Sequence, residues 1–301
     1  PVWTRGGRVM SESRANQSTT ATEGGETIPQ GFAGEIDRAM LAFNGPRQVS
    51  RVIKTATGNA IPWPTVDDTS VSGRLLAESA ALTTTDITYS SVTLNAYKYS
   101  SDAVKASSEL LEDSAFNLAT EFGSLLGERL GRKTAEAFTN GTGSSQPQGC
   151  AQAATVGKTA ASATAITADE LLDLLHALDP SYRGLSSTGW MLHDNVLLVL
   201  RKLKSNDSQY LWQPGLQAGV PDRLAGYPVT VNQNMNGTVA TTEKTILFGA
   251  FEKFIIRDAG NVRLFRLDEL YRANDQTGFI AFSRHESKVI RPDALQILQQ
   301  A

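Results

Sequence analysis

The sequence predicts a mixed α+β fold, and three features of the chain lead to that class. Residues 49–100 are rich in Thr, Ser, Val, Ile and Tyr and alternate with a period of two, as β-strands do. Residues 115–139 carry apolar side chains at helical spacing. The rest of the chain alternates short apolar runs with helical segments, a pattern typical of mixed domains.

The composition sets the first limits on function. With 301 residues, 41% of them hydrophobic, the chain can form one large or two modest domains. A net charge of -3 provides no global basic field, which disfavours sequence-specific binding of nucleic acid. No window approaches the roughly 20 apolar residues of a membrane span, and the N-terminus lacks the apolar core of a secretory signal. We therefore expect a cytoplasmically made protein with no membrane partner.

A single cysteine, Cys150, excludes an intrachain disulfide and a cysteine-rich zinc site. We interpret it as a small apolar filler or an incidental surface thiol.

The first 30 residues are predicted to form an extended arm. Residues 1–22 of this segment carry Arg5, Arg8 and Arg14 against a lone Glu12, and the whole segment contains too little apolar surface to pack alone. The arm therefore needs a partner surface.

A short amphipathic helix is expected after Pro29, and Gly45-Pro46 is expected to end it. Its apolar residues fall at near-helical spacing: Phe32, Ile36, Met40 and Leu41.

Residues 49–100 are predicted to form a long two-stranded excursion. The stretch from Pro62-Trp63-Pro64 through Asp67-Asp68 to Leu82 has no sustained period, so we expect it to be the wide tip. An isolated hairpin of this length is only marginally stable in water. We therefore expect it to lie on another molecule.

The longest helix is predicted over residues 115–139, with Asp113 or Ser114 as the cap and Asn140-Gly141 as the end. Three glycines spaced four apart each cost about 1 kcal/mol relative to Ala in a helix interior, so we expect close packing on their face. They are Gly123, Gly127 and Gly131, and the apolar stripe is Leu118, Phe122, Leu125, Leu126, Thr134, Ala137 and Phe138.

In the C-terminal half, Thr167 and Glu170 predict a capping box that opens a helix ended by Asp179-Pro180. The expected apolar face is Leu171, Leu172, Leu175 and Leu178. A buried strand at 190–192 and a helix over 194–204 follow, the latter with Val196, Leu197, Val199, Leu200 and Leu203. Further strands are predicted at 228–232, 245–248, 253–257, 262–267, 277–285 and 288–298.

The strong enzyme signatures are absent, namely the G-x-S-x-G elbow, the phosphate-binding loop and the H-E-x-x-H pair. Asp169, Asp173 and His176 fall at i, i+4 and i+7 and could bind a metal or relay a proton. We favour the solvated polar face of an amphipathic helix, which produces this spacing by default. His193-Asp194 precedes a helix, where Asp194 has a sufficient role as the N-cap.

Two further motifs have structural explanations. The adjacent acids Glu112-Asp113 and Asp67-Asp68 suit a helix terminus and a solvated loop better than a cation site. The glycines at 141, 143 and 149 lack the lysine that a phosphate cradle needs. We therefore predict no catalytic, metal-binding or cofactor-binding residue and no cofactor.

Several segments, taken in order, resemble the major capsid proteins of tailed phages with the Hong Kong 97-type capsid fold. The most specific is SSELLEDSAFNLATEFGSLLGERLGRKTAEAFTNGTGSSQPQG at 107–149, which is similar to the family's spine helix and the loop after it. The order of all the matching segments along the chain is more specific than any one of them. The segments are 24–36, 107–149, 167–183, 189–214, 224–235, 246–251 and 284–298.

The resemblance implies a division of the chain into five sections. They are an N-terminal arm and short helix (1–48), an extended β-hairpin loop (49–100), a peripheral domain with the spine helix (101–163), an axial domain (164–275) and C-terminal strands of the peripheral domain (276–301). Family precursors often carry a scaffolding segment before the arm, so processing before Pro1 and a separate scaffold are both open.

The implied function is a non-catalytic shell subunit that assembles through pentamers and hexamers into an icosahedral phage head around double-stranded DNA, without sequence-specific binding. Scaffold, protease, portal and decoration proteins are the implied partners, and the location is the virion, assembled in the bacterial cytoplasm. The expected inter-subunit contacts are Arg5, Arg8, Arg14, Trp63, Arg74 and Glu78. The alternatives are an encapsulin-like nanocompartment that holds cargo enzymes and a soluble α+β enzyme that uses Asp169, Asp173 and His176.

Some relatives join subunits by an isopeptide bond from an extended-loop lysine to a peripheral-domain asparagine, helped by a glutamate. Residues 55–97 contain no lysine, and no asparagine follows Asn274, although Glu286 is present. Lys54 and Lys98 lie only at the base of the excursion. We therefore expect non-covalent contacts between subunits.

Overall fold

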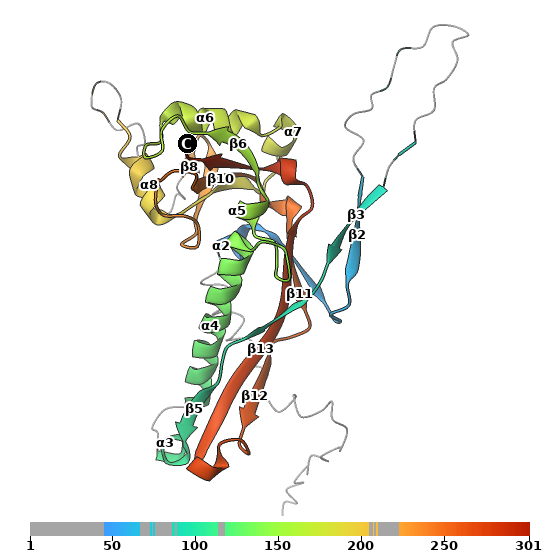
Figure 1. Ribbon diagram of the computed structural model, residues 1–301, viewed down its shortest axis with the longest axis vertical. Helices are drawn as coiled ribbons and strands as arrows, with labels where there is room; N and C mark the ends of the chain where they lie inside the picture. Colours follow the sequence, from blue (N-terminus) through green and yellow to red (C-terminus); the bar gives the residue numbers. More distant parts are fainter. Residues whose placement is uncertain are drawn as a thin grey trace, which may run out of the picture.

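The structure, a computed structural model, describes residues 45–66, 73, 75, 86–87, 89–113, 118–204, 207, 209 and 223–301. These residues form two six-stranded sheets and a separate two-stranded ribbon. One sheet and a long helix make an elongated lower part, the other sheet and three helices make a rounded upper part, and the ribbon projects beside the upper part (Figure 1).

The lower sheet is built on one long strand, β13 (Gln276–Val289), whose 14 residues span about 48 Å. The register places two short strands end to end along each side of it, since Phe282 pairs with both Ser100 and Arg263. On one side are β11 (Phe254–Ala259) and β12 (Arg263–Leu267), on the other β4 (Tyr97–Ser100) and β5 (Val104–Ser107), and β1 (Arg51–Thr55) pairs in parallel with β11.

Helix α4 (Leu118–Asn140) runs along this sheet, and the short α3 (Ser108–Asp113) precedes it (Figure 1). Leu126 and Leu130 of α4 pack on Phe279 and Ala281 of β13. The predicted helix and its end at Asn140 are confirmed, and Gly123, Gly127 and Gly131 are all buried. Of the two expected caps, Asp113 lies in α3 and Ser114 lies outside the described residues.

One residue was wrongly assigned to the buried apolar stripe of α4. Leu125 is 39% exposed, whereas its neighbour Leu126 is 0% exposed. Each residue turns a helix by about 100°, so only one of two adjacent leucines can lie at the centre of the buried face.

The upper sheet has the order β6-β14-β10-β7-β9-β8. Its strands are β6 (Thr155–Thr159), β14 (Leu295–Gln299), β10 (Lys244–Ala250), β7 (Thr188–Leu192), β9 (Tyr227–Val231) and β8 (Arg223–Leu224). Every residue of β7 is buried, because apolar side chains cover both faces of the sheet. This confirms the buried strand predicted at 190–192.

Three helices cover one face of the upper sheet: α6 (Ala168–Ala177), α7 (Pro180–Arg183) and α8 (Asp194–Arg201). The predicted capping box is confirmed, since Thr167 Oγ1 accepts the Glu170 N–H and Glu170 accepts the Thr167 N–H. Leu172, expected on the apolar face, is 50% exposed, and Leu174 is buried in its place. The buried set 171, 174, 175 and 178 has true helical spacing.

The start and the face of α8 also differ from the prediction. His193 is the N-cap, and its Nδ1 accepts the Asn195 N–H at 3.0 Å. Asp194 is the first helical residue, where its negative charge favours the positive end of the helix dipole. Val199, expected on the apolar face, is 37% exposed, while Val196, Leu197 and Leu200 are buried.

The ribbon consists of β2 (Ile61–Val66) and β3 (Tyr89–Leu94), paired antiparallel from Ile61 with Leu94 to Val66 with Tyr89. A two-stranded ribbon is thus confirmed within the excursion predicted at 49–100, but it is shorter, because β1 and β4 pair in the lower sheet. Pro62-Trp63-Pro64 belongs to a strand rather than to the tip. Alternate N–H groups of a two-stranded ribbon point away from the partner strand, so prolines at alternate positions need not break the pairing.

Gly45-Pro46, expected to end the helix after Pro29, are the first two residues of α2 (Gly45–Val49). Proline suits the first turn of a helix, where its missing N–H costs no helical hydrogen bond. The helix predicted after Pro29 lies outside the described residues.

An apolar cluster joins the upper and lower parts. It includes Phe138 of α4, Met191 and Leu247 of the upper sheet, and Phe254 and Ile256 of the lower sheet. Cys150, at the start of α5 (Cys150–Ala153), belongs to the same cluster, and burial raises the pKa of its thiol to about 12. The filler interpretation of this cysteine is therefore confirmed.

The two sheets do not coincide with the boundaries of the five sections expected along the chain. Strands β11 and β12, within 164–275, pair with β13 in the lower sheet. Strand β14, within 276–301, pairs with β10 in the upper sheet. The chain thus crosses between the two sheets more than once.

Leu126→Ala should lower the free energy of unfolding by roughly 3 kcal/mol, because it removes a fully buried side chain between α4 and the lower sheet. Leu125→Ala is the matched control and should change it by no more than about 0.5 kcal/mol. Denaturant unfolding followed by circular dichroism measures both, and equal losses would contradict the assigned face of α4.

Candidate functional site at the base of the hairpin

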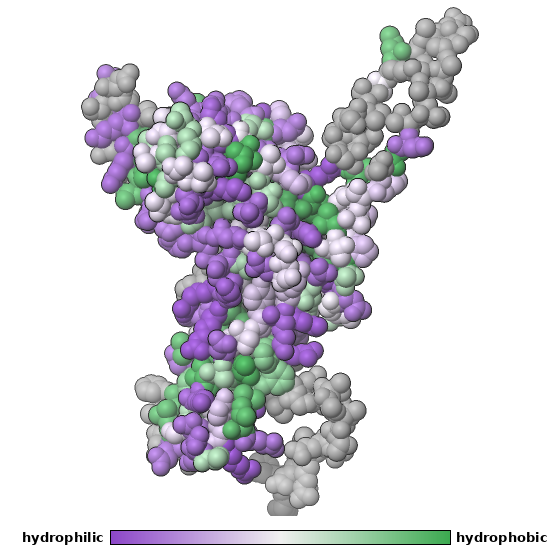
Figure 2. All heavy atoms as spheres, viewed as in Figure 1, coloured by the Kyte–Doolittle hydropathy of each residue, from purple (hydrophilic) through white to green (hydrophobic). Residues whose placement is uncertain are grey.

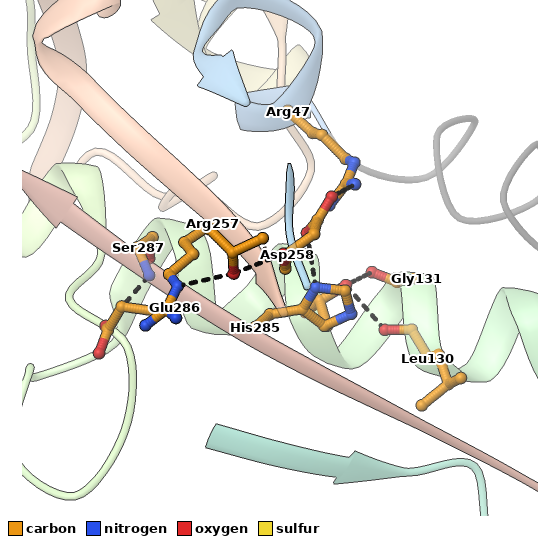
Figure 3. A network of polar contacts seen from close by, with 10 residues as sticks. Arg47, Leu130, Gly131, Arg257, Asp258, His285, Glu286 and Ser287 are labelled. Carbon is orange, nitrogen blue, oxygen red and sulfur yellow. Dashed lines mark hydrogen bonds and ion pairs between the residues drawn. The ribbon is translucent and has the colours of Figure 1, made fainter. Parts of the chain in front are cut away.

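Charged side chains are buried where the ribbon leaves the body, in the middle of β11 and β13 (Figure 3). Adjacent residues of a strand point to opposite faces, so Arg257 and Asp258 of β11 serve opposite faces of the lower sheet. The register places Glu286 opposite Arg257 and His285 opposite Asp258.

Arg257 is 0% exposed and donates four hydrogen bonds to the two chain segments that lead into and out of the ribbon. Its Nη1 reaches the carbonyl oxygens of Leu94 and Asn95 at 2.8 and 3.1 Å. Its Nη2 reaches the Thr57 carbonyl at 2.9 Å, and its Nε reaches Thr55 Oγ1 at 3.0 Å. Burial lowers the pKa of this guanidinium, and the nearby Glu286 carboxylate opposes that shift.

Glu286 binds the segment after β3, which Arg257 also binds. Its carboxylate accepts the Asn95 N–H at 3.2 Å and the Ser287 N–H at 3.1 Å. Burial raises the pKa of Glu286 despite these bonds. The Asn95 backbone is therefore bound through its N–H by Glu286 and through its carbonyl by Arg257.

On the opposite face, Asp258 binds the side chains of two other residues. Arg47 of α2 forms a two-bond ion pair with its carboxylate, one bond being 3.1 Å, and His285 Nδ1 lies 2.7 Å from Asp258 Oδ1. Burial alone would raise the pKa of Asp258, but the bonds to His285 and Arg47 outweigh it and hold the pKa below its usual value. Asp258 thereby ties α2 to the lower sheet.

His285 sits between this ion pair and α4. With Asp258 as the acceptor, Nδ1 carries a proton, and Nε2 has no hydrogen-bond partner among the described residues. The ring meets Phe138 edge-on, with the centroids 6.1 Å apart. The arrangement holds charge in place and offers no nucleophile with an adjacent base.

The suspected enzyme residues are dispersed on the surface of α6. Asp173 pairs with Lys158 at 2.6 Å, His176 Nδ1 lies 3.3 Å from Arg183 Nη1, and Asp169 is exposed. Within the described residues, no group of three His, Cys, Asp or Glu side chains could hold a metal ion. The solvated-face interpretation accounts for all three positions.

The glycine loop after α4 is structural. Gln148 N–H donates to the Ser287 carbonyl at 2.9 Å, and Ser287 Oγ donates to the Gln148 carbonyl at 2.8 Å. A side chain at Gly141 would meet the Pro147 carbonyl oxygen at 2.2 Å, so only glycine fits there. The loop therefore packs on β13.

Of the six expected inter-subunit residues, Arg5, Arg8, Arg14, Arg74 and Glu78 lie outside the described residues, as does Asp67-Asp68. Trp63 lies in β2, half-buried, with the Arg51 guanidinium carbon 5.7 Å from its ring centroid. Trp63 therefore already has a partner within its own chain.

The sequence reasoning missed Arg47, Arg257, Asp258 and His285, and named Glu286 only for cross-linking chemistry. One signal was present: FIIRDA places two adjacent charges inside an apolar strand, where an unpaired charge would be costly. Such a pattern indicates a buried, partnered cluster.

The sequence profile described as "Phage capsid family" matches residues 24–300, nearly the whole chain. The chain belongs to the phage capsid family. The predicted fold class, the α+β capsid fold of the Hong Kong 97 type, is confirmed by this match and by solved capsids of the same fold. The family indicates that this capsid protein is structural rather than enzymatic.

Solved capsids resemble this capsid protein over most of their length. The capsid of an empty GTA particle computed with C5 symmetry has 26% identity and a TM-score of 0.74, covering 86% of this chain and 90% of that chain. The capsid of a native GTA particle has 23% identity and a TM-score of 0.74, with 99% and 100% covered. A structure from Mycobacterium phage Adephagia has 13% identity and a TM-score of 0.63, with 86% and 90% covered.

No curated protein sequence matches the chain. Among the described residues, none of the helices combines the length and the apolar content needed to span a bilayer.

Asp258→Asn should destabilise the protein by about 3 kcal/mol at pH 7, because it removes the carboxylate charge from a buried ion pair with Arg47. The folded-state pKa of Asp258 is lowered, so the stabilisation is present above about pH 4, the ordinary carboxyl pKa. It is lost as the pH falls through the folded-state pKa, where the variant and the wild type should converge.

The matched control is Asp173→Asn, which breaks an exposed pair with Lys158 and should leave stability unchanged. Urea unfolding at several pH values makes the comparison. If the free energies of unfolding of Asp258→Asn and the wild type differed by the same amount down to strongly acidic pH, the assigned role of the Asp258 carboxylate would be contradicted.

Proposed function

We propose that this chain is the major shell subunit of a phage head, which assembles through pentamers and hexamers into an icosahedral container around double-stranded DNA. The observation that carries the proposal is the two-stranded ribbon. Its strands pair only with each other among the described residues. The ribbon projects beside the body (Figures 1 and 2), held at its base and, at the other end of β2, by the bond from Arg291 to the Val66 carbonyl.

The side chains of the ribbon support a role in contacts between subunits. Tyr89 of β3 is 71% exposed, and Ile87, two residues before it along the chain, is 52% exposed. A ribbon of two strands is marginally stable alone, and an exposed apolar surface of this kind gains free energy when another subunit covers it. The capsids of the GTA particles, computed with C5 symmetry, support assembly into a shell with five-fold vertices.

The lower sheet supports the same proposal. Apolar side chains gather on the lower part of the molecule (Figure 2). On the sheet face turned away from α4, Phe265, Ile280 and Phe282 are only half-buried, and Lys98 Nζ lies 4.0 Å from the Phe282 ring centroid. Aromatic rings flanked by cations are common at protein interfaces.

We assign the lower sheet with α4 to the peripheral domain and the upper sheet with α6, α7 and α8 to the axial domain. This assignment follows the sheets, so β11 and β12 join the peripheral domain and β14 joins the axial domain. Residues 1–44 would form the arm and residues 61–94 the extended loop. Arg5, Arg8, Arg14, Arg74 and Glu78 keep their proposed place in contacts between subunits, in the virion.

The encapsulin-like nanocompartment is the second candidate, since a container for cargo enzymes would need the same subunit contacts. The content of the particle distinguishes the two, because a phage head holds DNA and a nanocompartment holds protein. Scaffold, protease, portal and decoration proteins belong with the first proposal only.

Purified full-length protein should form pentamers, hexamers or closed shells, seen by negative-stain microscopy and by sedimentation. Particles from infected cells should contain double-stranded DNA and no stoichiometric enzyme. A strictly monomeric protein at high concentration would contradict the shell function, and the enzyme alternative predicts that outcome.

Asp173→Ala and His176→Ala should leave assembly and bound-metal content unchanged. A loss of stoichiometric metal in either variant would favour the enzyme.

Mature particles boiled in denaturing detergent should release monomers of 32.4 kDa, because residues 55–97 offer no lysine for an isopeptide bond. Lys54 and Lys98 lie in β1 and β4, at the base of the ribbon. Denaturing electrophoresis with and without reductant is the measurement. A ladder of multimers that survives reduction would contradict non-covalent locking.

A further inference from the structure

The ribbon is attached to the body mainly through its backbone. Four charged side chains of the body bind backbone atoms of the ribbon or of its two connecting segments. Besides Arg257 and Glu286, Lys288 Nζ donates to the Thr93 carbonyl at 3.3 Å, and Arg291 Nη2 donates to the Val66 carbonyl. Arg257, Glu286 and Lys288 act at the base of the ribbon, whereas Arg291 binds the opposite end of β2, where Val66 pairs with Tyr89.

Arg257 is the member that joins both connecting segments. Thr55 and Thr57 lie before β2, whereas Leu94 and Asn95 lie at and after the end of β3. A guanidinium has five N–H donors in one plane, so it can bind several acceptors on two segments at once. A lysine has three donors on one atom and cannot match four acceptors spread over that plane.

The body side of this attachment is rigid. Arg257 lies in β11, paired with β13 on one side and with β1 on the other. Leu94 is 1% exposed, so the last residue of β3 is also anchored by packing. The orientation of the guanidinium is therefore fixed relative to the lower sheet.

The geometry gives small changes at the base a large effect at the far end. Strands β2 and β3 have six residues each, so the stem is about 20 Å long. A rotation of about 10° at its base would move the far end of that stem, where Arg291 binds the Val66 carbonyl, by about 3 to 4 Å. Such a displacement is comparable to the spacing between neighbouring strands.

We propose that Arg257 is a positioning residue that sets the direction in which the ribbon leaves the body, and through it the angle between neighbouring subunits. The part that concerns neighbouring subunits rests on the proposed shell function. Weakening this attachment should leave the chain folded but produce shells of mixed size. It should also loosen the two connecting segments locally.

The test uses Arg257→Lys in the full-length protein, with Arg266→Lys as the matched control. Arg266 lies on β12 in the same sheet, and its side chain is 62% exposed in a pair with Asp268. Lysine keeps the charge beside Glu286, so the variant removes donor geometry rather than the counter-charge.

Hydrogen exchange gives the first readout. The Asn95 amide, bound to Glu286, and the Gly260 amide, bound to the Thr55 carbonyl at 2.7 Å, should exchange about tenfold faster in Arg257→Lys. The amides of α4 should keep their wild-type rates in both variants. Unchanged exchange at Asn95 and Gly260 would overturn the positioning role.

Particle size gives the second readout. Electron microscopy should show one diameter for wild type and Arg266→Lys, and several diameters or open sheets for Arg257→Lys. Uniform wild-type particles from Arg257→Lys would overturn the link to subunit angle. If the wild type forms no particles, the proposed shell function is wrong. The hydrogen-exchange result still tests whether Arg257 holds the segments at the base of the ribbon.

Thr55→Val covers the case in which Arg257→Lys does not fold. It removes the acceptor of Arg257 Nε, together with the bonds that Thr55 Oγ1 donates to the Thr57 and Asp258 carbonyl oxygens, and leaves the guanidinium in place. Exchange at Asn95 and Gly260 should rise by a smaller factor, and particles should be less uniform than wild type. Wild-type behaviour in both readouts would count against the proposal.

Discussion

The structure depends on two adjacent residues of β11 whose charges are buried on opposite faces of one sheet. Arg257 binds the base of the ribbon on one face, and Asp258 binds α2 and His285 on the other. Burying these charges costs free energy, which only a nearly complete set of hydrogen bonds offsets. Arg257 has four such bonds, and Asp258 has bonds to two cationic or polar partners. Because removal of any partner leaves a buried charge, the arrangement specifies one geometry for the segments that meet there.

This geometry places the parts of the chain that need neighbours on a rigid frame. The apolar cluster through Phe138, Met191 and Phe254 joins the two sheets, and α4 stiffens the lower one along most of its length. Each subunit of a closed shell must present its contacts at a reproducible angle, since small angular errors accumulate around the shell. A stiff body with a projecting ribbon fixed at its base meets that requirement. The half-exposed aromatic side chains of the lower sheet add a second surface on the same frame.

Much of the fold could be predicted from local sequence, because its signals are local. The capping box at Thr167, the end of α4 at Asn140 and the buried strand at 190–192 all follow from a few neighbouring residues. The errors arose where two adjacent residues compete for one role. Leu125 and Leu126 differ only in the angle at which the helix presents them, and the tertiary contact decides which is buried. His193 and Asp194 compete to be the N-cap, and His193 takes that role by accepting the Asn195 N–H. The sequence also did not predict which sheet β11 and β14 belong to, because each pairs with strands that are distant in sequence.

The candidate site was missed for a different reason, which also bears on how it works. The groups that Arg257, Lys288 and Arg291 bind on the ribbon and its connections are mostly carbonyl oxygens, and every residue has one. Such acceptors leave no mark in the sequence, so no motif in residues 55–95 could reveal the attachment. Apart from Leu94, whose buried side chain packs at the base, the side chains of the ribbon are consequently not needed for its anchoring. They remain available for contacts with other subunits, which explains how a segment can be held firmly at its base while its exposed residues, such as Ile87 and Tyr89, serve another surface.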